Sequence, residues 1–504
     1  MNGSSWTAYH WAIVGFCLIA FVGAGLMADL VFERVPHIED EVAYLFQAQV
    51  FASGQVYVGA PFHTNCFFAP FVLDHEGRRF GKYSPGWPAL LSLGLWMGQA
   101  WWINAACTAL TVALVFRLGR EMHHPGIGAL AAGMGSISPF VLLLSGSLMS
   151  HSACLLFATA FVWCFWRGRK GGDAWSLAAG VALGAAFAIR PFTAFAIACP
   201  AILWMMWDVG QRWRRAGAGS GRAWRRLWFT GLGFVPLALT VPLFNALWTG
   251  DPFLSPYVLF WPYDRLGFGP GHGPLPQGNT IWLGLSSAFA ALGQLASYLH
   301  GWPALSLSFV VLLFVFKPRC VADLFLAATA CSLVFGYVLY WTSGDVFGPR
   351  YAYEATSALL ILSAAGILRV WRYFEQEHAA GNRRAVRPTS LLAGLLVLLT
   401  LGNLVGYLPW QWERYSELYG VTGEPRELLL AAELDNALVI VRDENGWKDY
   451  AVAFSMNAPT YDGPVVYAND CSPLNDRLVA HYPARKVYLF DGKALRPYVP
   501  GEKP

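Results

Sequence analysis

The feature that most constrains the fold of this chain is a series of apolar segments, each close to the length that crosses a membrane. Spanning the ~30 Å hydrocarbon core of a bilayer takes about 20 apolar residues in a helix. Only 13% of the 504 residues are charged, against roughly 25% in a soluble globular protein. The chain is therefore expected to be mainly α, a polytopic membrane helix bundle. Eleven segments of this kind occur: 11–32, 101–118, 127–144, 148–166, 174–190, 191–207, 227–248, 302–316, 321–341, 352–370 and 391–408.

Lys and Arg cluster between these segments and predict the orientation of the chain. Short loops rich in Lys and Arg face the cytoplasm in most membrane proteins. With eleven spans and a cytoplasmic N-terminus, every basic loop falls on the cytoplasmic side. We expect an integral protein of a bacterial inner (plasma) membrane in this orientation. The basic loops are 117–120, 167–170, 212–226, 317–319 and 369–387.

Two further apolar pieces, 87–97 and 281–299, do not fit this count. If either crossed alone, later basic loops would invert. If both crossed, the very basic loop 212–226 would face outward. We expect both pieces to be interfacial or re-entrant helices, and thirteen spans are the alternative.

The C-terminal tail differs in character from the apolar segments. Short runs rich in β-branched and aromatic residues, bounded by turn residues, predict strands. We expect a membrane domain at 1–408 and a small extracytoplasmic α/β domain at 409–504. The same topology places loops 33–86, 249–280 and 343–351 on the outer face beside this domain. The runs are 437–441, 463–467 and 486–490.

Two cysteines, Cys66 in the first outer loop and Cys471 in the tail, are expected to face the same compartment. An oxidising compartment would allow them to pair. The alternative, which the sequence favours, is two free thiols, because two cysteines leave no spacing pattern that identifies a bridge.

Three consecutive carboxylates, Glu39, Asp40 and Glu41, follow the first apolar segment. Charged residues near hydrocarbon cost free energy and tend to mark a pathway or a site. Apolar residues then recur at helical spacing from Val42 to Val50, which predicts an interfacial amphipathic helix. The dipole at its N-terminus favours the acids. The alternative is a capped surface helix in a loop.

Lys82 and Arg350 stand where outer loops re-enter the membrane. An ammonium group and a guanidinium group are both good partners for phosphate oxygens. The alternatives are a Lys that extends to the lipid headgroups and an Arg that pairs with Glu354 one helical turn later. Together with the carboxylates, the two cations predict a site that contains a base and binds phosphate at membrane level.

Three short blocks occur in a fixed order: DEVAY at 40–44, KYSPGWP at 82–88 and GPRY at 348–351. They resemble the Asp-Glu-x-x-Tyr, Lys-x-Pro-Pro-like and Arg-Tyr motifs of GT-C superfamily membrane glycosyltransferases. The resemblance is to the bacterial family 39 type, which includes protein O-mannosyltransferases and lipid A aminoarabinose transferases. Here Ser84-Pro85 stands in place of the two prolines.

The resemblance implies an inverting enzyme that transfers a hexose or pentose at the outer face. The donor would be a polyprenyl-phosphate-linked sugar and the acceptor a lipid, a glycan or a protein. Nucleic acid is not an expected partner. Asp40 is implied as the general base that takes the proton of the acceptor hydroxyl. Lys82 and Arg350, with the adjacent Tyr83 and Tyr351, are implied to bind the donor phosphate, whose charge fixed cations stabilise.

The three contiguous acids leave the position of the base open. Asp40 is favoured, Glu39 is the alternative one residue away, and Glu41 is the third candidate. Like charges this close repel, so one acid is expected to be protonated or to pair with His37 or an Arg.

Four residues of the outer loops are candidates for substrate contacts, namely His63, Asp264, Arg265 and His272. The last three lie in a loop rich in Gly, Pro and aromatic residues. The alternative is a rigid loop packed over the membrane core. We expect no cofactor, although the first-loop acids with a remote acid would also suit Mg²⁺ or Mn²⁺, since oxygen ligands leave no spacing pattern.

A rival hypothesis is a transporter or flippase of a lipid-linked glycan, in which the same cations bind phosphate and no sugar is transferred. Transporters often contain internal repeats and ionic sites at the bilayer midplane. This chain has no clear repeat, and its ionic candidates cluster at one face, which favours the enzyme. A third hypothesis is an assembly protein with a degenerate site.

Overall fold

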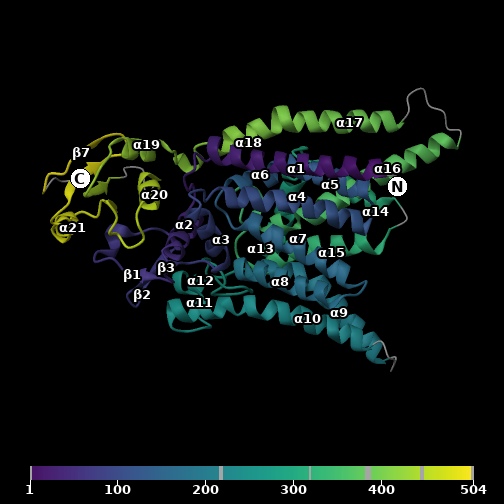
Figure 1. Cartoon of the computed structure of the whole chain (residues 1–504), viewed down its shortest axis with the longest axis horizontal. Helices are drawn as coiled ribbons and strands as arrows, with labels where there is room; N and C mark the ends of the chain where they lie inside the picture. The colour runs from purple at the N-terminus through teal and green to yellow at the C-terminus, as the bar shows by residue number, and fades with distance from the viewer. Residues whose placement is uncertain (1–2, 215–219, 317–318, 381–387, 443–447, 501–504) are drawn as a thin grey trace.

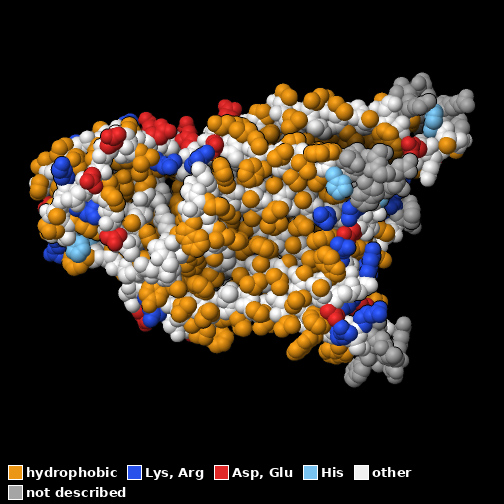
Figure 2. Space-filling view, viewed as in Figure 1, with side chains coloured by type: hydrophobic (Ala, Val, Ile, Leu, Met, Phe, Trp, Pro, Cys, Tyr) orange, Lys and Arg blue, Asp and Glu red, His pale blue; other side chains and the backbone are white. Residues whose placement is uncertain are grey.

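The computed structural model describes residues 3–214, 220–316, 319–380, 388–442 and 448–500. Long helices run roughly side by side through most of the molecule, and a small α/β unit (424–442 and 448–500) lies at one end (Figure 1). Hydrophobic side chains cover the visible face of the helical part as a broad band (Figure 2). The expected fold, a mainly α polytopic membrane bundle with a small α/β unit, is confirmed.

Helices occupy all eleven predicted segments. Within the described residues, seven helices are long and apolar enough to cross a membrane, or eight if α5 and α6, bent by 53°, form one broken span. The remaining predicted spans form helices that are too short or not apolar enough to meet this criterion. The helices of the bundle are α1 Gly3–Leu30, α4 Trp102–Met122, α5 Pro125–Ser136, α6 Pro139–Gly146, α7 His151–Gly168, α8 Asp173–Ile189, α9 Pro191–Arg214, α10 Ser220–Ala238, α11 Thr240–Thr249, α13 Ile281–Tyr298, α14 Ser308–Val315, α15 Val321–Gly336, α16 Thr356–Ala379 and α17 Pro388–Gly402.

The two ambiguous apolar pieces form α3 (Gly86–Trp96) and α13. Helix α3 has 11 residues, too few to cross ~30 Å of hydrocarbon at 1.5 Å per residue. Helix α13 has 18 residues but is not among the seven helices that combine the length and apolar content of a span. By length and apolar content neither counts as a span, which agrees with the expectation of interfacial or re-entrant helices.

The described parts of the basic loops lie together at the end of the bundle that bears the N-terminus (Figures 1 and 2). Ion pairs form at this end, one between two of the loops and one across the loop 212–226. Arg167 Nε lies 3.4 Å from Oε2 of Glu121, and Arg226 Nη1 lies 3.2 Å from Oδ2 of Asp208. The single basic end that the sequence predicts is therefore present.

The first loop after α1 contains α2 (Glu39–Ala52), η1 (Thr64–Phe67) and a three-stranded antiparallel sheet that the sequence analysis missed. Two of its strands are joined at Glu76 and Gly77, which both have positive φ, as in the tightest hairpin turns. The second of these two strands, Arg78–Gly81, ends against α2, where the Gly81 N–H donates to Oε1 of Gln47 at 2.8 Å. This contact sets the direction in which residues 82–84 leave the sheet. The strands are β1 Val58–Gly59, β2 Val72–His75 and β3 Arg78–Gly81, in the order β1-β3-β2.

The C-terminal α/β unit is built on a four-stranded sheet in the order β5-β4-β6-β7. Strand β4 is central and completely buried, and it pairs in parallel with β5 and β6. Two predicted strands match β4 and β6, the third lies two residues further on as β5, and the edge strand β7 was not predicted. The elements of this part of the chain are α18 Leu408–Tyr415, α19 Glu424–Ala431, β4 Ala437–Val441, α20 Lys448–Ser455, β5 Val465–Asn469, α21 Asn475–His481, β6 Lys486–Phe490 and β7 Leu495–Pro497.

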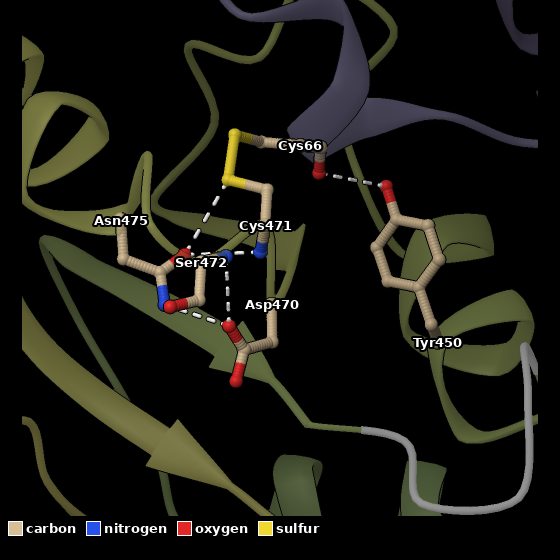
Figure 3. The surroundings of a disulfide bond; sticks show 6 residues. All are labelled: Cys66, Tyr450, Asp470, Cys471, Ser472 and Asn475. Carbon is tan, nitrogen blue, oxygen red and sulfur yellow. Dashed lines mark hydrogen bonds between the residues drawn. A yellow bond between two sulfur atoms is a disulfide. The ribbon is translucent and has the colours of Figure 1, made fainter. Parts of the chain in front are cut away.

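A disulfide between Cys66 and Cys471 fastens the α/β unit to the first loop (Figure 3). The hydroxyl of Tyr450 donates to the carbonyl oxygen of Cys66 at 3.3 Å, and the Cys471 N–H donates to Oδ1 of Asn475 at 3.0 Å. The buried guanidinium of Arg79 extends this contact, because it lies between aromatic rings from both parts. Of the two alternatives that the sequence leaves open for these cysteines, the structure contains the bridge.

Candidate active site

A cavity of about 900 Å³ opens where the bundle meets the first loop. Its walls combine the N-terminus of α2, the chain after β3, the start of α9, helices α11 and α12 (Pro256–Phe260) and the loop before α16. Aromatic and aliphatic side chains dominate the lining. The ionisable side chains of opposite charge that line it are Lys82, Arg190, Arg265 and Arg350 on the basic side, and Glu39, Asp40 and Asp264 on the acidic side.

Asp40 lies in the first turn of α2 and faces the cavity. The hydroxyl of Tyr83 donates to its Oδ1 at 2.7 Å, and Nη1 of Arg350 lies 3.8 Å from its Oδ2. The positive end of the helix dipole favours a negative charge at this position. A hydroxyl and a guanidinium from two distant segments therefore hold the carboxylate in place, and it keeps access to the cavity.

Glu41 points away from the cavity, although it adjoins Asp40 in sequence. Its Oε2 accepts the backbone N–H groups of His37 at 2.9 Å and Ile38 at 3.3 Å, and its Oε1 accepts that of Leu148 at 2.6 Å. The side chain is fully buried, and burial raises its pKa to about 7. Glu41 thus caps its own helix and ties α2 to the turn before α7.

Glu39 lines the cavity beside Asp40. Burial raises the pKa of its carboxyl, and the negative charge of Asp40 adds to the effect. Of the three contiguous acids, Glu39 and Asp40 therefore line the cavity, whereas Glu41 caps α2 and holds it to the turn before α7.

Lys82 is buried in a cage of aromatic rings. Its Nζ lies 2.9 Å from Oδ2 of Asp264. Burial lowers the pKa of Lys82, and the charge of Asp264 opposes this effect. Ring faces attract a cation, so the cage fixes the ammonium group at one point of the cavity wall. The rings with centroids nearest to Nζ are those of Trp261 (4.1 Å), Phe71 (4.5 Å), Tyr257 (5.2 Å) and Phe260 (5.4 Å).

Asp264 is itself held on its other oxygen. Its Oδ1 accepts the hydroxyl of Tyr340 at 2.7 Å and the indole N–H of Trp341 at 3.0 Å. From the sequence, this residue is a candidate for a substrate contact. In the structure Asp264 lines the cavity and also serves as the counter-ion that positions Lys82.

Arg350 begins the 3₁₀ helix η3 (Arg350–Ala355). Among the described residues, its buried Nε and Nη1 have no hydrogen-bond partner, and Nη1 makes the ion-pair contact with Asp40. Tyr351 stacks on Tyr337 with ring centroids 4.6 Å apart and lines the same wall. The loop before η3 needs glycine at Gly348, where φ is +79° and a Cβ would lie 2.7 Å from the ring of Tyr298.

Glu354 does not pair with Arg350, which corrects the alternative drawn from the sequence. That alternative assumes an α-helix, but the 3₁₀ turn of η3 rotates residues four apart onto different faces. Glu354 instead lies 3.5 Å from Nε of Arg190 and 3.2 Å from Nδ1 of His151. Arg190 also donates to the hydroxyl of Tyr337 at 3.2 Å. This buried cluster at the cavity floor joins three membrane segments and has no spacing pattern in the sequence.

The remaining candidates are dispersed. Arg265 is exposed at the rim of the cavity. His63 is not part of the lining and contacts Phe62 near the disulfide. His272 also lies outside it, and its N–H donates to the carbonyl of Gly269 at 3.2 Å within its own loop. The structure thus brings Asp40, Lys82, Arg350 and Asp264 together around one cavity and leaves both histidines apart.

Residues 89–219 match the sequence model of the dolichyl-phosphate-mannose-protein mannosyltransferase family. The match covers the bundle from α3 through α9, about a quarter of the chain. A search of curated proteins finds no match.

Two solved structures have a similar fold. ArnT from Cupriavidus metallidurans bound to undecaprenyl phosphate matches with a TM-score of 0.55 and 13% identity, over 97% of this chain and 90% of that chain. The oligosaccharyltransferase of Archaeoglobus fulgidus in complex with Zn and sulfate matches with a TM-score of 0.52 and 15% identity, over 95% and 67%. At such identities the likeness concerns the fold. With the family match, it confirms the resemblance to GT-C glycosyltransferases that the motifs indicate.

Proposed function

We propose that this chain is an integral membrane glycosyltransferase that moves a sugar from a polyprenyl-phosphate donor to an acceptor, with inversion at the anomeric carbon. The family match, the GT-C-type fold and the mixed character of the cavity support this function. The similar ArnT structure is of a protein bound to undecaprenyl phosphate, a ligand of the same chemical class as the leaving group of the proposed reaction.

The active site and the α/β unit face the extracytoplasmic side in this proposal. Two observations support the orientation. The basic loop ends gather at the opposite end of the bundle, as is usual for cytoplasmic ends, and the Cys66–Cys471 disulfide lies at the end near the cavity, where an oxidising compartment would preserve it. In the proposed division, 1–408 form the catalytic membrane domain and 409–504 the extracytoplasmic domain.

Asp40 acts as the general base. A sugar hydroxyl is a poor nucleophile, and a positioned carboxylate can accept its proton as the new glycosidic bond forms at the anomeric carbon. The bond from that carbon to the phosphate oxygen breaks on the opposite face, and its electron pair leaves with the polyprenyl phosphate. The observation that carries this assignment is the position of Asp40, which lines the cavity between Tyr83 and Arg350.

Cations on the cavity wall receive the charge of the leaving phosphate. Arg350 presents Nε and Nη1, and a guanidinium can bind phosphate oxygens in pairs. Lys82 adds a fixed point charge, whose effect is enhanced in a cavity of low polarity. Apolar side chains from the bundle, such as Phe192 and Val241, line the same cavity and suit the lipid portion of the donor.

The proposal is tested with the purified full chain in lipid nanodiscs, supplied with labelled polyprenyl-phosphate-linked sugars and a cell-envelope extract as the source of acceptor. We expect label to move from the lipid to an acceptor fraction in a manner that depends on the protein. If the chain instead moves lipid-linked glycan across a vesicle bilayer and transfers no label from any donor, the enzyme proposal is wrong and the chain is a flippase.

A further inference from the structure

A second group of chemically active side chains lies where the end of α4 meets the start of α15. These helix ends belong to the end of the bundle opposite the cavity (Figure 1). His123 follows α4, Cys320 precedes α15, and Asp323 lies in the first turn of α15. One nitrogen of His123, the Sγ of Cys320 and one carboxylate oxygen of Asp323 lie within 4.8 Å of one another. Two segments almost two hundred residues apart in sequence therefore bring three potential metal ligands together.

Two of these ligands have polar atoms without a hydrogen-bond partner among the described residues. They are Nε2 of His123 and Oδ1 of Asp323, which face each other at the ion-pair distance of 3.5 Å, with side chains 10% and 0% exposed. The other ring nitrogen of His123, Nδ1, lies 3.9 Å from Sγ of Cys320. The other oxygen of Asp323 accepts the backbone N–H of Cys320 at 3.0 Å, so its orientation is fixed. Buried polar atoms usually have partners, and a cation between these residues would provide one.

We propose that His123, Cys320 and Asp323 form a binding site for Zn²⁺. A thiolate, an imidazole and a carboxylate are all ligands that Zn²⁺ accepts, with bonds of about 2.0–2.3 Å. In a tetrahedral site such ligands lie roughly 3.3–3.8 Å apart, so ligand atoms that now lie up to 4.8 Å apart would move together by as much as about 1 Å. The exposed side of Cys320 leaves the fourth position to water.

The local charges suit a divalent ion. A thiolate and a carboxylate together neutralise Zn²⁺, so the occupied site itself would carry no net charge beside the cations around it. These include Arg369, whose positive charge acts on His123, and Arg372, which contacts the neighbouring His124 at 3.2 Å. Because His123 follows α4 and the other two ligands belong to α15, the ion would fasten the corner of α4 and α5 to the start of α15.

Cobalt(II) provides the test, because it occupies tetrahedral zinc sites and gives a thiolate-to-metal charge-transfer band in the near ultraviolet. The full-length protein in nanodiscs is titrated with Co²⁺ after chelator treatment. We expect one equivalent to bind with this band, and Zn²⁺ to displace it. No charge-transfer band in the wild-type protein, or a band that Zn²⁺ does not remove, would overturn the proposal.

Variants identify the ligands. Cys320→Ser should abolish the band, whereas Cys331→Ser, a second exposed cysteine on α15, should keep it. His123→Gln and Asp323→Asn should each weaken Co²⁺ binding by at least about tenfold. Size-exclusion profiles establish that the variants remain folded. Persistence of the band in Cys320→Ser, or its loss in the folded Cys331→Ser protein, would contradict the assignment.

Discussion

The ammonium of Lys82 lies 2.9 Å from Oδ2 of Asp264, inside a cage of aromatic rings. Lys82 follows the first-loop sheet, and Asp264 belongs to the loop after α12. Their contact closes one wall of the cavity across two segments that are distant in sequence. Since Asp264 is also fixed by Tyr340 and Trp341, the position of the cation is set before any ligand arrives, which is what electrostatic stabilisation of a leaving phosphate requires.

Lys82→Met should lower kcat/KM for the lipid-linked donor by about 10²–10³-fold, because a fixed charge aimed at the leaving group is lost. Lys82→Arg should not restore activity, since rings 4.1 and 4.5 Å from Nζ leave no space for a guanidinium. Steady-state transfer assays measure both. The matched control is Lys486→Met, an exposed lysine on β6, which should behave as wild type. Full activity of Lys82→Met would exclude a role for this cation.

Glu41→Gln should destabilise the protein by about 1–3 kcal/mol and leave transfer per folded molecule unchanged. The reason is that the amide presents a donor where the carboxylate accepts the backbone N–H groups of His37, Ile38 and Leu148. Thermal unfolding in detergent measures the loss, and Glu76→Gln, in the exposed hairpin turn, serves as the control. A large loss of turnover at unchanged stability would instead make Glu41 a catalytic residue.

The pH dependence of stability follows from the same residue. Burial raises the pKa of Glu41 from 4.5 to about 7, so between these values the folded protein keeps a proton that the unfolded chain releases. Stability should therefore fall as the pH rises from 4.5 to about 7, by about 3 kcal/mol at most. Glu41→Gln lacks this titration, so the stability advantage of the wild type should narrow over the same range. If the free energies of unfolding of wild type and Glu41→Gln differ by the same amount at pH 5 and pH 8, this expectation is wrong.

Loss of the Cys66–Cys471 disulfide should loosen the α/β unit from the first loop, with a destabilisation of about 2–4 kcal/mol. Limited proteolysis of Cys66→Ser should release fragments of residues 448–500 earlier than in the wild type. Cys199→Ser, a free cysteine in α9, is the control. Equal protection of Cys66→Ser and wild type would mean that the packing around Arg79 holds the unit without the bridge.

Local patterns allow much of the fold to be predicted from the sequence. The apolar segments locate the helices, because hydropathy reports a property of each segment alone. The strands of the α/β unit are found in the same way, since β4 and β6 are short β-branched runs. The first-loop sheet is missed because its strands are only two to four residues long and owe their pairing to the turn at Gly77 and to contact with α2.

Only part of the site can be predicted from the sequence, because local motifs reveal some of its residues and not their partners. Asp40, Lys82 and Arg350 belong to short ordered motifs, and the structure gathers all three around one cavity. The partners that orient them are set by tertiary contacts that no local pattern records. Asp264 beside Lys82 is one example, and the pairing of Glu354 with Arg190 and His151 is another.

The most direct test of the account is sugar transfer by Asp40→Asn, compared with Glu39→Gln and wild type in the same nanodiscs. If Asp40 is the general base, Asp40→Asn should lose about 10²–10⁴-fold in kcat and still bind the lipid donor, because Arg350 and Lys82 are intact. Glu39→Gln should keep most of its activity. If Asp40→Asn transfers sugar at the wild-type rate and Glu39→Gln does not, Asp40 is not the base and Glu39 takes its place.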